Sequence, residues 1–247
     1  VGGDFYDFFE LDAHRVAVAV GDVSGKGVPA AFFMAVSRTL LRAVSSFDAG
    51  PAACLRQLND LLAADNDEMM FVTLFYAVID TRDGSVTWGN GGHNPPYVLR
   101  ASGAIEDLPG HGNMALAVME GMDYQEGRLS LAAGDALFLF SDGVTEAMSP
   151  SRELYGEPRL EALLATLRDV PVAEVPERVL AALRQFEGEG AQADDITSLI
   201  ARYTEPWLDC RAPQAAGSVR TAAGDRHRPV AGAAIRPVRL YLRGACA

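Results

Sequence analysis

The alternation of apolar and polar positions along the chain predicts a series of strands and helices. Short runs rich in β-branched and aromatic residues predict strands at residues 15–20, 71–79, 85–88, 97–99, 136–140 and 196–203. Apolar residues spaced three and four apart predict helices over residues 29–46, 51–64, 159–168 and 175–186. One helical pair lies among the strands and the other precedes the last strand. This order favours an antiparallel α+β domain over a parallel doubly wound sheet.

The periodic pattern ends at about residue 204. Residues 205–247 are rich in Ala, Arg, Gly and Pro without a sustained period, so we expect a poorly ordered tail behind one domain at residues 1–204. The chain carries 33 acidic and 21 basic residues, for a net charge of −12. An acidic domain argues against a nucleic-acid partner, which would require a basic surface. The same charge also serves plain solubility.

The sequence contains no pattern typical of export. No apolar run approaches the ~20 residues needed to cross a bilayer, and the start lacks the basic and apolar regions of a signal peptide. The three cysteines, Cys54, Cys210 and Cys246, are widely spaced and suit neither a disulfide framework nor a metal site. We therefore expect a cytoplasmic protein. Because the sequence opens with Val1, we also expect a fragment of a longer protein.

Several acidic residues lie where predicted strands begin or end. Asp22 follows the strand at 15–20, Asp142 follows the strand at 136–140, and Asp194 and Asp195 directly precede the strand at 196–203. Asp4 lies near the start of the chain. In an antiparallel sheet the end of one strand lies beside the start of its neighbour. These carboxylates can therefore converge on one edge of the domain.

Convergent carboxylates need neutralisation, because like charges raise one another's pKa. Oxygen ligands favour Mg²⁺ or Mn²⁺ over zinc, which prefers His and Cys. Two such ions ~3.5–4 Å apart can share a hydroxide and clamp phosphoryl oxygens. Any one of these acids alone is explained equally well as a turn residue, since Asp-Gly is a common turn dipeptide. Only the whole set predicts a metal centre.

Five ordered segments give the chain a family resemblance. They are VGGDFYD at residues 1–7, GDVSGKG at 21–27, GHNPP at 92–96, SDGVTE at 141–146 and DDIT at 194–197. The chain resembles the SpoIIE/RsbU-type phosphatases, the bacterial branch of the PPM metal-dependent serine/threonine protein phosphatases. The resemblance implies an αββα sandwich of two antiparallel sheets flanked by helices, with a two-metal centre at one edge.

The resemblance also implies roles for particular residues. Asp4, Asp22 and Asp142 would be the catalytic metal ligands, joined by the Val23 main-chain carbonyl and Asp194, and the cofactors would be two divalent cations, Mn²⁺ or Mg²⁺. Asp195 would support these ligands without binding metal. Apart from the resemblance, Asp7 is a candidate supporting residue, and His93 could be an acid, a ligand or a brace. Since two prolines follow His93, a rigid turn fixed by its imidazole is favoured over catalysis.

The implied substrate is phosphoserine or phosphothreonine on a regulatory protein, often a STAS-domain anti-anti-sigma factor of a partner-switching circuit. The implied partners are an upstream sensor domain and a second copy in a homodimer, and the helical pair near residues 29–64 matches the region that regulates activity. Two alternatives stay open: a catalytically silent pseudophosphatase that acts as a binding module, and a metal-dependent nuclease. Lys26 could hold phosphate, donate a proton or be simply solvated.

Overall fold

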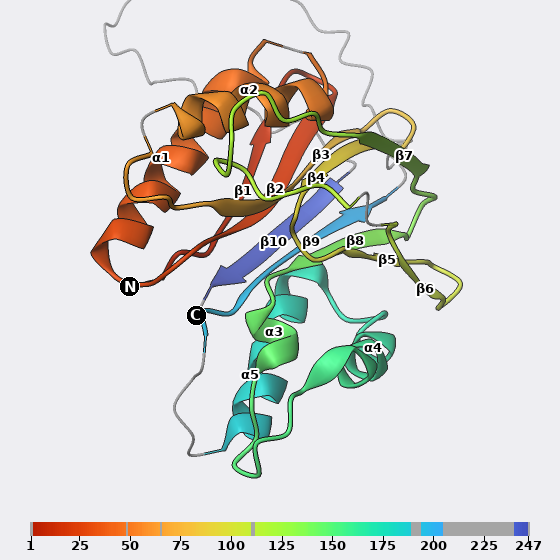
Figure 1. Cartoon of the computed structure of the whole chain (residues 1–247). Helices are drawn as coiled ribbons and strands as arrows, with labels where there is room; N and C mark the ends of the chain where they lie inside the picture. Colours follow the sequence, from red (N-terminus) through yellow and green to blue (C-terminus); the bar gives the residue numbers. More distant parts are fainter. Residues whose placement is uncertain are drawn as a thin grey trace, which may run out of the picture.

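Two antiparallel sheets pack face to face in the computed structural model, which describes residues 2–47, 49–64, 66–109, 112–188, 194–204 and 240–246 (Figure 1). The first sheet has the order β1-β2-β3-β4-β7 and the second β10-β9-β8-β5-β6. The first consists of β1 (Phe5–Glu10), β2 (Arg15–Val23), β3 (Val72–Asp80), β4 (Ser85–Gly91) and β7 (Glu126–Ser130). The second consists of β5 (Tyr97–Leu99), β6 (Ile105–Asp107), β8 (Ala136–Phe140), β9 (Thr197–Tyr203) and β10 (Leu240–Cys246).

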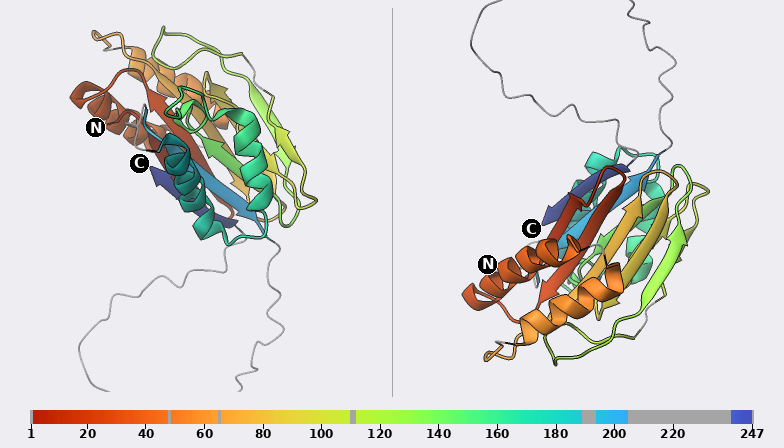
Figure 2. Two further views of the ribbon diagram at one scale, coloured as in Figure 1. Left: turned by 90° about the horizontal axis from the view of Figure 1, so that it is seen from below. Right: turned by 90° about the horizontal axis from the view of Figure 1, so that it is seen from above.

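Helices cover the outer faces of both sheets. Helices α1 (Val28–Ser45) and α2 (Pro51–Ala63) lie on the first sheet, and α3 (Gly143–Glu146), α4 (Gly156–Thr166) and α5 (Val175–Glu187) lie on the second, with a short 3-10 turn at Val172–Glu174 (Figures 1 and 2). The predicted α+β sandwich of two antiparallel sheets flanked by helices is therefore confirmed.

Strand β2 shows why the sequence forms this sandwich. Its valines Val16, Val18 and Val20 are buried in the core between the two sheets. Its alanines Ala17 and Ala19 face the helices instead. Successive side chains of a strand point to opposite faces, so one strand serves both layers. The small alanines let α1 approach the sheet closely.

Strand β8 divides its side chains in the same way. Leu137 and Leu139 join the core between the sheets, whereas Phe138 and Phe140 pack under the helices of the second sheet. A strand buried on both faces reads as an uninterrupted apolar run. This explains why residues 136–140 were recognisable in the sequence.

The predicted helices and strands agree with the structure apart from shifts of a few residues at their ends. The sequence pattern missed β1, β6, β7 and α3. Strand β7 is largely exposed and short, so it lacks the apolar signature of a buried strand. Strand β1, with the sequence FYDFFE, lacks the regular alternation of apolar and polar residues that marks a strand.

The predicted tail at 205–247 is wrong for its last residues. Strand β10 pairs antiparallel with β9 along its whole length, from Leu240 opposite Tyr203 to Cys246 opposite Thr197. An unpaired sheet edge accepts any extended segment that can offer main-chain hydrogen bonds. Residues 205–239 lie outside the described part of the chain.

Helix α1 bears on the expectation that the sequence contains no membrane-spanning segment. Within the described ranges it is the one helix with the length and apolar composition of a membrane span. Of this helix, 28% is buried within the protein. Its inner face, which includes Leu41 and Val44, packs on the first sheet. Such a helix passes the same test when it belongs to a folded core, so the observation is weak evidence for a membrane.

Candidate metal centre

The first pair of acids lies where β1 begins and β2 ends. Phe5 pairs with Gly21 across the two strands, so Asp4 and Asp22 extend from neighbouring positions at one edge of the sheet. Asp4 is buried and shares a hydrogen bond with Asp22. Burial raises the pKa of Asp4, and the charge of Asp22 raises it further. The Asp4 carboxyl is therefore protonated more readily than an ordinary aspartate.

The second pair lies where β8 ends and β9 begins. The Ser141 N–H donates to the Thr197 carbonyl at 3.0 Å, and the Thr197 N–H donates to Ser141 Oγ at 3.0 Å. These two bonds fix the strand ends, with Asp142 following one and Asp194 preceding the other. Burial raises the pKa of Asp142, and the charge of Asp194 adds to this effect.

The acids of the two sheets share one electrostatic field. Burial raises the pKa of Asp22, and the charges of Asp142, Asp194 and Asp195 raise it further. The structure therefore places the carboxylates that the sequence predicted at strand ends within electrostatic reach of one another. Their convergence concentrates negative charge in a partly buried site, which favours a bound cation.

A divalent cation fits the chemistry of this site. Asp4 Oδ2 is buried and has no hydrogen-bond partner. A buried oxygen without a partner is costly, and a cation would satisfy it. Among the described residues, no three His, Cys, Asp or Glu side chains are grouped closely enough to hold one ion. Two carboxylates, a carbonyl and water would then supply the ligands, which suits Mg²⁺ because it keeps several waters.

Glycines next to the acids allow the close approach of the backbone. A Cβ atom on Gly3 would lie 2.6 Å from the Val23 carbonyl oxygen, the predicted main-chain ligand. A Cβ atom on Gly143 would collide with the carbonyl oxygen of Asp195. The Gly3 N–H also donates to Asp195 Oδ2 at 3.1 Å. Asp195 thus ties the N-terminal motif to the second sheet, and its role in supporting the metal ligands stays a prediction.

His93 links the two sheets beneath the acids. Its Nε2 lies 3.1 Å from the Phe140 carbonyl and its Nδ1 lies 2.9 Å from the Thr73 hydroxyl. Because a carbonyl only accepts, Nε2 carries the proton and Nδ1 accepts from Thr73. Burial lowers the pKa of His93 to about 4, so the ring is neutral at pH 7. These contacts fit a rigid brace.

Asp7, the third predicted supporting residue, faces helix α1. Arg42 donates to its carboxylate through Nε and Nη2, each at 2.6 Å, and Arg38 Nε lies 3.1 Å away. Burial opposes ionisation of Asp7, but the bonds to Arg42 and Arg38 outweigh it and lower the pKa. Asp7 therefore joins β1 to α1, and any support of the metal ligands would act through this joint.

Lys26 lies close to a predicted ligand. Its Nζ is 3.0 Å from Asp194 Oδ1, although both side chains are well exposed. The hydrogen bond to Asp194 and the nearby carboxylates raise the pKa of Lys26. In the metal-free protein the ammonium group thus neutralises part of the acidic site.

Sequence reasoning missed three hydroxyl residues that organise this edge. Thr73 pairs with Asp22 across β2 and β3, and Ser141 and Thr197 hydrogen-bond to the Asp4 side chain. Their chain spacing gives no signal, because only strand register brings them to the acids. Ser141 also lacks the glycine two positions before it that a serine-hydrolase elbow requires, because position 139 is Leu.

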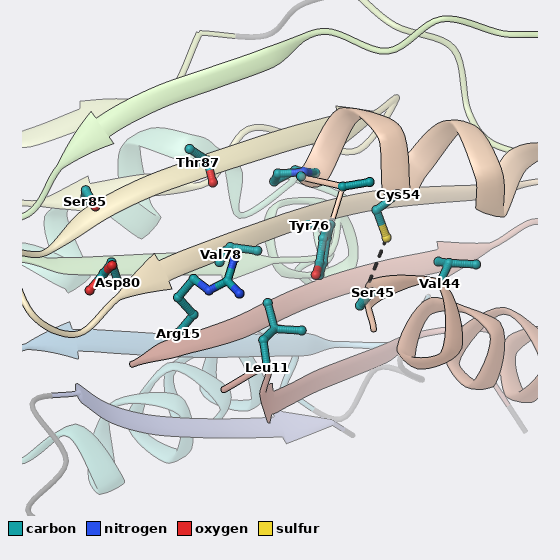
Figure 3. A pocket seen from close by; sticks show the side chains of 13 residues that line it. Leu11, Arg15, Val44, Ser45, Cys54, Tyr76, Val78, Asp80, Ser85 and Thr87 are labelled. Carbon is teal, nitrogen blue, oxygen red and sulfur yellow. Dashed lines mark hydrogen bonds between the residues drawn. The ribbon is translucent and has the colours of Figure 1, made fainter. Parts of the chain in front are cut away.

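A cavity of about 200 Å³ lies at the opposite end of the first sheet (Figure 3). Its wall includes Arg15, Asp80 and Cys54, whose sulfur lies 3.5 Å from Ser45 Oγ. Arg15 opens β2, seven residues before Asp22, which corresponds to about 23 Å along a strand. This cavity lies under the joint between α1 and α2 and is separate from the acids.

Comparison with known proteins shows that the chain belongs to the SpoIIE family. Residues 12–204 match the family Stage II sporulation protein E (SpoIIE). Protein IcfG of Synechocystis sp. is 33% identical over 230 residues, covering 82% of this chain and 36% of that protein. Phosphoserine phosphatase RsbU of Bacillus subtilis is 29% identical over 203 residues, covering 82% of this chain and 59% of RsbU. The chain thus spans less than two thirds of either relative.

A solved structure agrees with these matches. The SiaA-PP2C domain of Pseudomonas aeruginosa superposes with a TM-score of 0.73 at 25% sequence identity. The alignment covers 82% of this chain and 81% of that domain. The paired antiparallel sheets with outer helices are therefore the fold of a PP2C-type phosphatase domain.

Proposed function

Because the chain belongs to the SpoIIE family, we propose that its acidic edge is the active site of a metal-dependent serine/threonine protein phosphatase. The proposed reaction is hydrolysis of a phosphoserine or phosphothreonine monoester on a regulatory protein. One observation carries this proposal: carboxylates from both sheets converge, and their pKa values are raised by burial and by one another. Carboxylates whose pKa values are perturbed by burial and by neighbouring charges cluster at functional sites.

Each residue of the acidic edge would have a role that follows from its position in the two sheets. The first sheet would supply Asp4, Asp22 and the Val23 carbonyl as metal ligands. The second sheet would supply Asp142 and Asp194. Two bound cations, Mn²⁺ or Mg²⁺, would activate water and neutralise the phosphoryl oxygens. Ser141 and Thr197 would orient the Asp4 carboxylate through their hydrogen bonds. The chain would act by positioning and charge and would form no covalent bond to phosphorus.

The family supports a finer proposal about the substrate. We infer that the phosphoprotein is a STAS-domain anti-anti-sigma factor and that its dephosphorylation in the cytoplasm switches a partner-switching circuit. The relatives are longer than this chain. We also propose that an upstream sensor domain controls this domain and that the protein pairs into a homodimer.

Hydrolysis of p-nitrophenyl phosphate with Mn²⁺ tests the catalytic proposal. We expect turnover by the wild type, loss of turnover with a chelator, and a fall of at least about 100-fold in kcat for Asp22→Asn, the scale of losing an electrostatic contact to the transition state. Asp123→Asn is the matched control, because Asp123 is an exposed surface acid.

The same assay distinguishes the alternatives. A folded wild type that binds Mn²⁺ but does not turn over the ester would point to the pseudophosphatase. Cleavage of plasmid DNA that Asp22→Asn abolishes would point to the nuclease. Normal turnover by Asp22→Asn would refute the assignment of the site.

A further inference from the structure

Helices α1 and α2 leave an apolar groove open to solvent. The groove has a volume of about 650 Å³, and its wall includes Val28, Phe32, Phe33, Val36, Leu61 and Met70. Val28 is 78% exposed, Phe32 is 73% exposed and Leu61 is 49% exposed. Single exposed apolar residues are ordinary, but a gathered set that lines a hollow marks a binding surface.

The groove is continuous with the acidic edge. A second hollow of about 300 Å³ is lined by Ser24, Gly25 and Lys26, and it shares Pro29, Glu68 and Met70 with the apolar groove. Lys26 in turn lies 3.0 Å from Asp194. An unbroken surface therefore leads from the carboxylates, across the loop after β2, to the apolar groove.

This surface has a fixed shape near the acids. The Ser24 N–H donates to the Phe71 carbonyl at 2.9 Å, and the Phe71 N–H donates to Ser24 Oγ at 2.9 Å. The loop after β2 and the segment entering β3 are thereby tied together. A partner seated against Met70 would be held at a set distance from the acids.

We propose that the groove, defined by Val28, Phe32, Phe33, Val36, Leu61 and Met70, docks the folded phosphoprotein substrate. This inference rests on the proposed function. A two-metal site recognises the phosphoryl group, which is alike on every phosphoprotein, so selection of one substrate requires a neighbouring surface. Continuity with the acids favours the substrate over any other occupant, because only the substrate must touch both regions at once.

The groove also indicates the chemistry of the docked surface. Its apolar wall would take one or two aliphatic or aromatic side chains, which carry most of the binding energy of such contacts. Asp67 and Glu68 lie at its rim. The matching substrate face is therefore apolar at its centre and basic or neutral at its edge, beside the phosphorylated residue.

The test compares three substrates: a phosphorylated STAS-domain protein, a short phosphopeptide from it, and p-nitrophenyl phosphate. Wild type should have a kcat/KM at least about tenfold higher for the folded protein than for the peptide, a ratio worth ~1.4 kcal/mol. Phe32→Asp should remove this advantage by raising KM and leave turnover of p-nitrophenyl phosphate within about twofold, the size of ordinary surface effects.

Two further variants test whether the effect of Phe32→Asp is specific to the groove. Leu61→Asp, on the opposite wall, should reproduce the effect of Phe32→Asp. Phe47→Asp is the matched control, since Phe47 follows the other end of α1, is 69% exposed and lies outside the groove lining. All variants are checked for unchanged circular dichroism and thermal unfolding.

The outcomes separate the two proposals. Equal rates of the wild type on folded protein and peptide overturn the docking proposal. Equal losses on all three substrates in Phe32→Asp also overturn it, because the groove would then serve a regulatory segment or the fold. Absence of Mn²⁺-dependent turnover of p-nitrophenyl phosphate by the wild type would instead refute the proposed function.

Discussion

The Arg42→Met substitution tests how α1 is fastened to the strand that follows Asp4. In the wild type, Arg42 donates two hydrogen bonds of 2.6 Å to Asp7, and its guanidinium lies 4.7 Å from the centre of the Phe9 ring. Asp7 is 3% exposed, whereas Arg42 is 47% exposed. Methionine keeps the apolar contact with Phe9 but leaves the Asp7 carboxylate with Arg38 and the Phe8 N–H as its partners.

The magnitude follows from this half-buried geometry. Breaking a fully buried ion pair costs about 3–5 kcal/mol, and an exposed pair is worth about 0–1 kcal/mol. Because Arg42 is half-exposed and Arg38 still pairs with Asp7, we expect a loss of about 1–2 kcal/mol in the free energy of unfolding at pH 7. Urea denaturation measures this value. Arg128→Met is the control, because Arg128 is 80% exposed, and it should change stability by less than about 0.5 kcal/mol.

The pH dependence provides the refutation. The folded-state pKa of Asp7 is lowered, so the carboxylate contributes stability above its unfolded pKa of about 3.9 and loses it as pH falls through the folded value. The difference between wild type and Arg42→Met should therefore be full at pH 7 and shrink below pH ~4. A difference that stays constant from pH 7 to pH 3 would show that packing, and not the Asp7 charge, sets the cost.

Two further predictions concern the acidic edge. The affinity for Mn²⁺, measured by calorimetry, should rise with pH across the neutral range, because the pKa values of Asp4 and Asp22 are raised. The rise should be about tenfold per pH unit for each proton that the cation displaces. An affinity that does not change with pH would contradict the raised pKa values. Lys26→Met should tighten Mn²⁺ binding by no more than about fivefold, because the exposed Lys26–Asp194 ion pair competes only weakly with a cation. If Lys26→Met instead binds Mn²⁺ more weakly, Lys26 supports the metal site.

The positions of the acids at the sheet edge could be predicted because uninterrupted apolar strands lie next to them in the sequence. A carboxylate next to an uninterrupted apolar strand must lie at the rim of a sheet, as Asp22 and Asp142 do. The hydroxyl residues beside the acids gave no sequence signal, because only strand register brings them there. Thr73 lies 51 residues beyond Asp22, and only the register of β2 with β3 places the two opposite each other. Register depends on the whole sheet and is not written in local spacing.

The role of Asp7 could not be predicted for a related reason. In the sequence it lies three residues after Asp4, in the same motif. In a strand, side chains separated by an odd number of residues point to opposite faces. Asp7 consequently turns toward α1, where Arg38 and Arg42 are spaced by four residues and share one helical face.

Helix α1 combines two faces whose separation matters for the proposed function. Through Arg42 its C-terminal half is tied to Asp7, on the strand that begins directly after Asp4. Through Phe32 its N-terminal half is open to solvent beside the loop that carries Lys26. A substitution at the open end can therefore change docking without moving the ligands, whereas a substitution at Arg42 should disturb both stability and the placement of Asp4. A loss of Mn²⁺ affinity in Arg42→Met that is absent from Phe32→Asp would show that the two ends act independently.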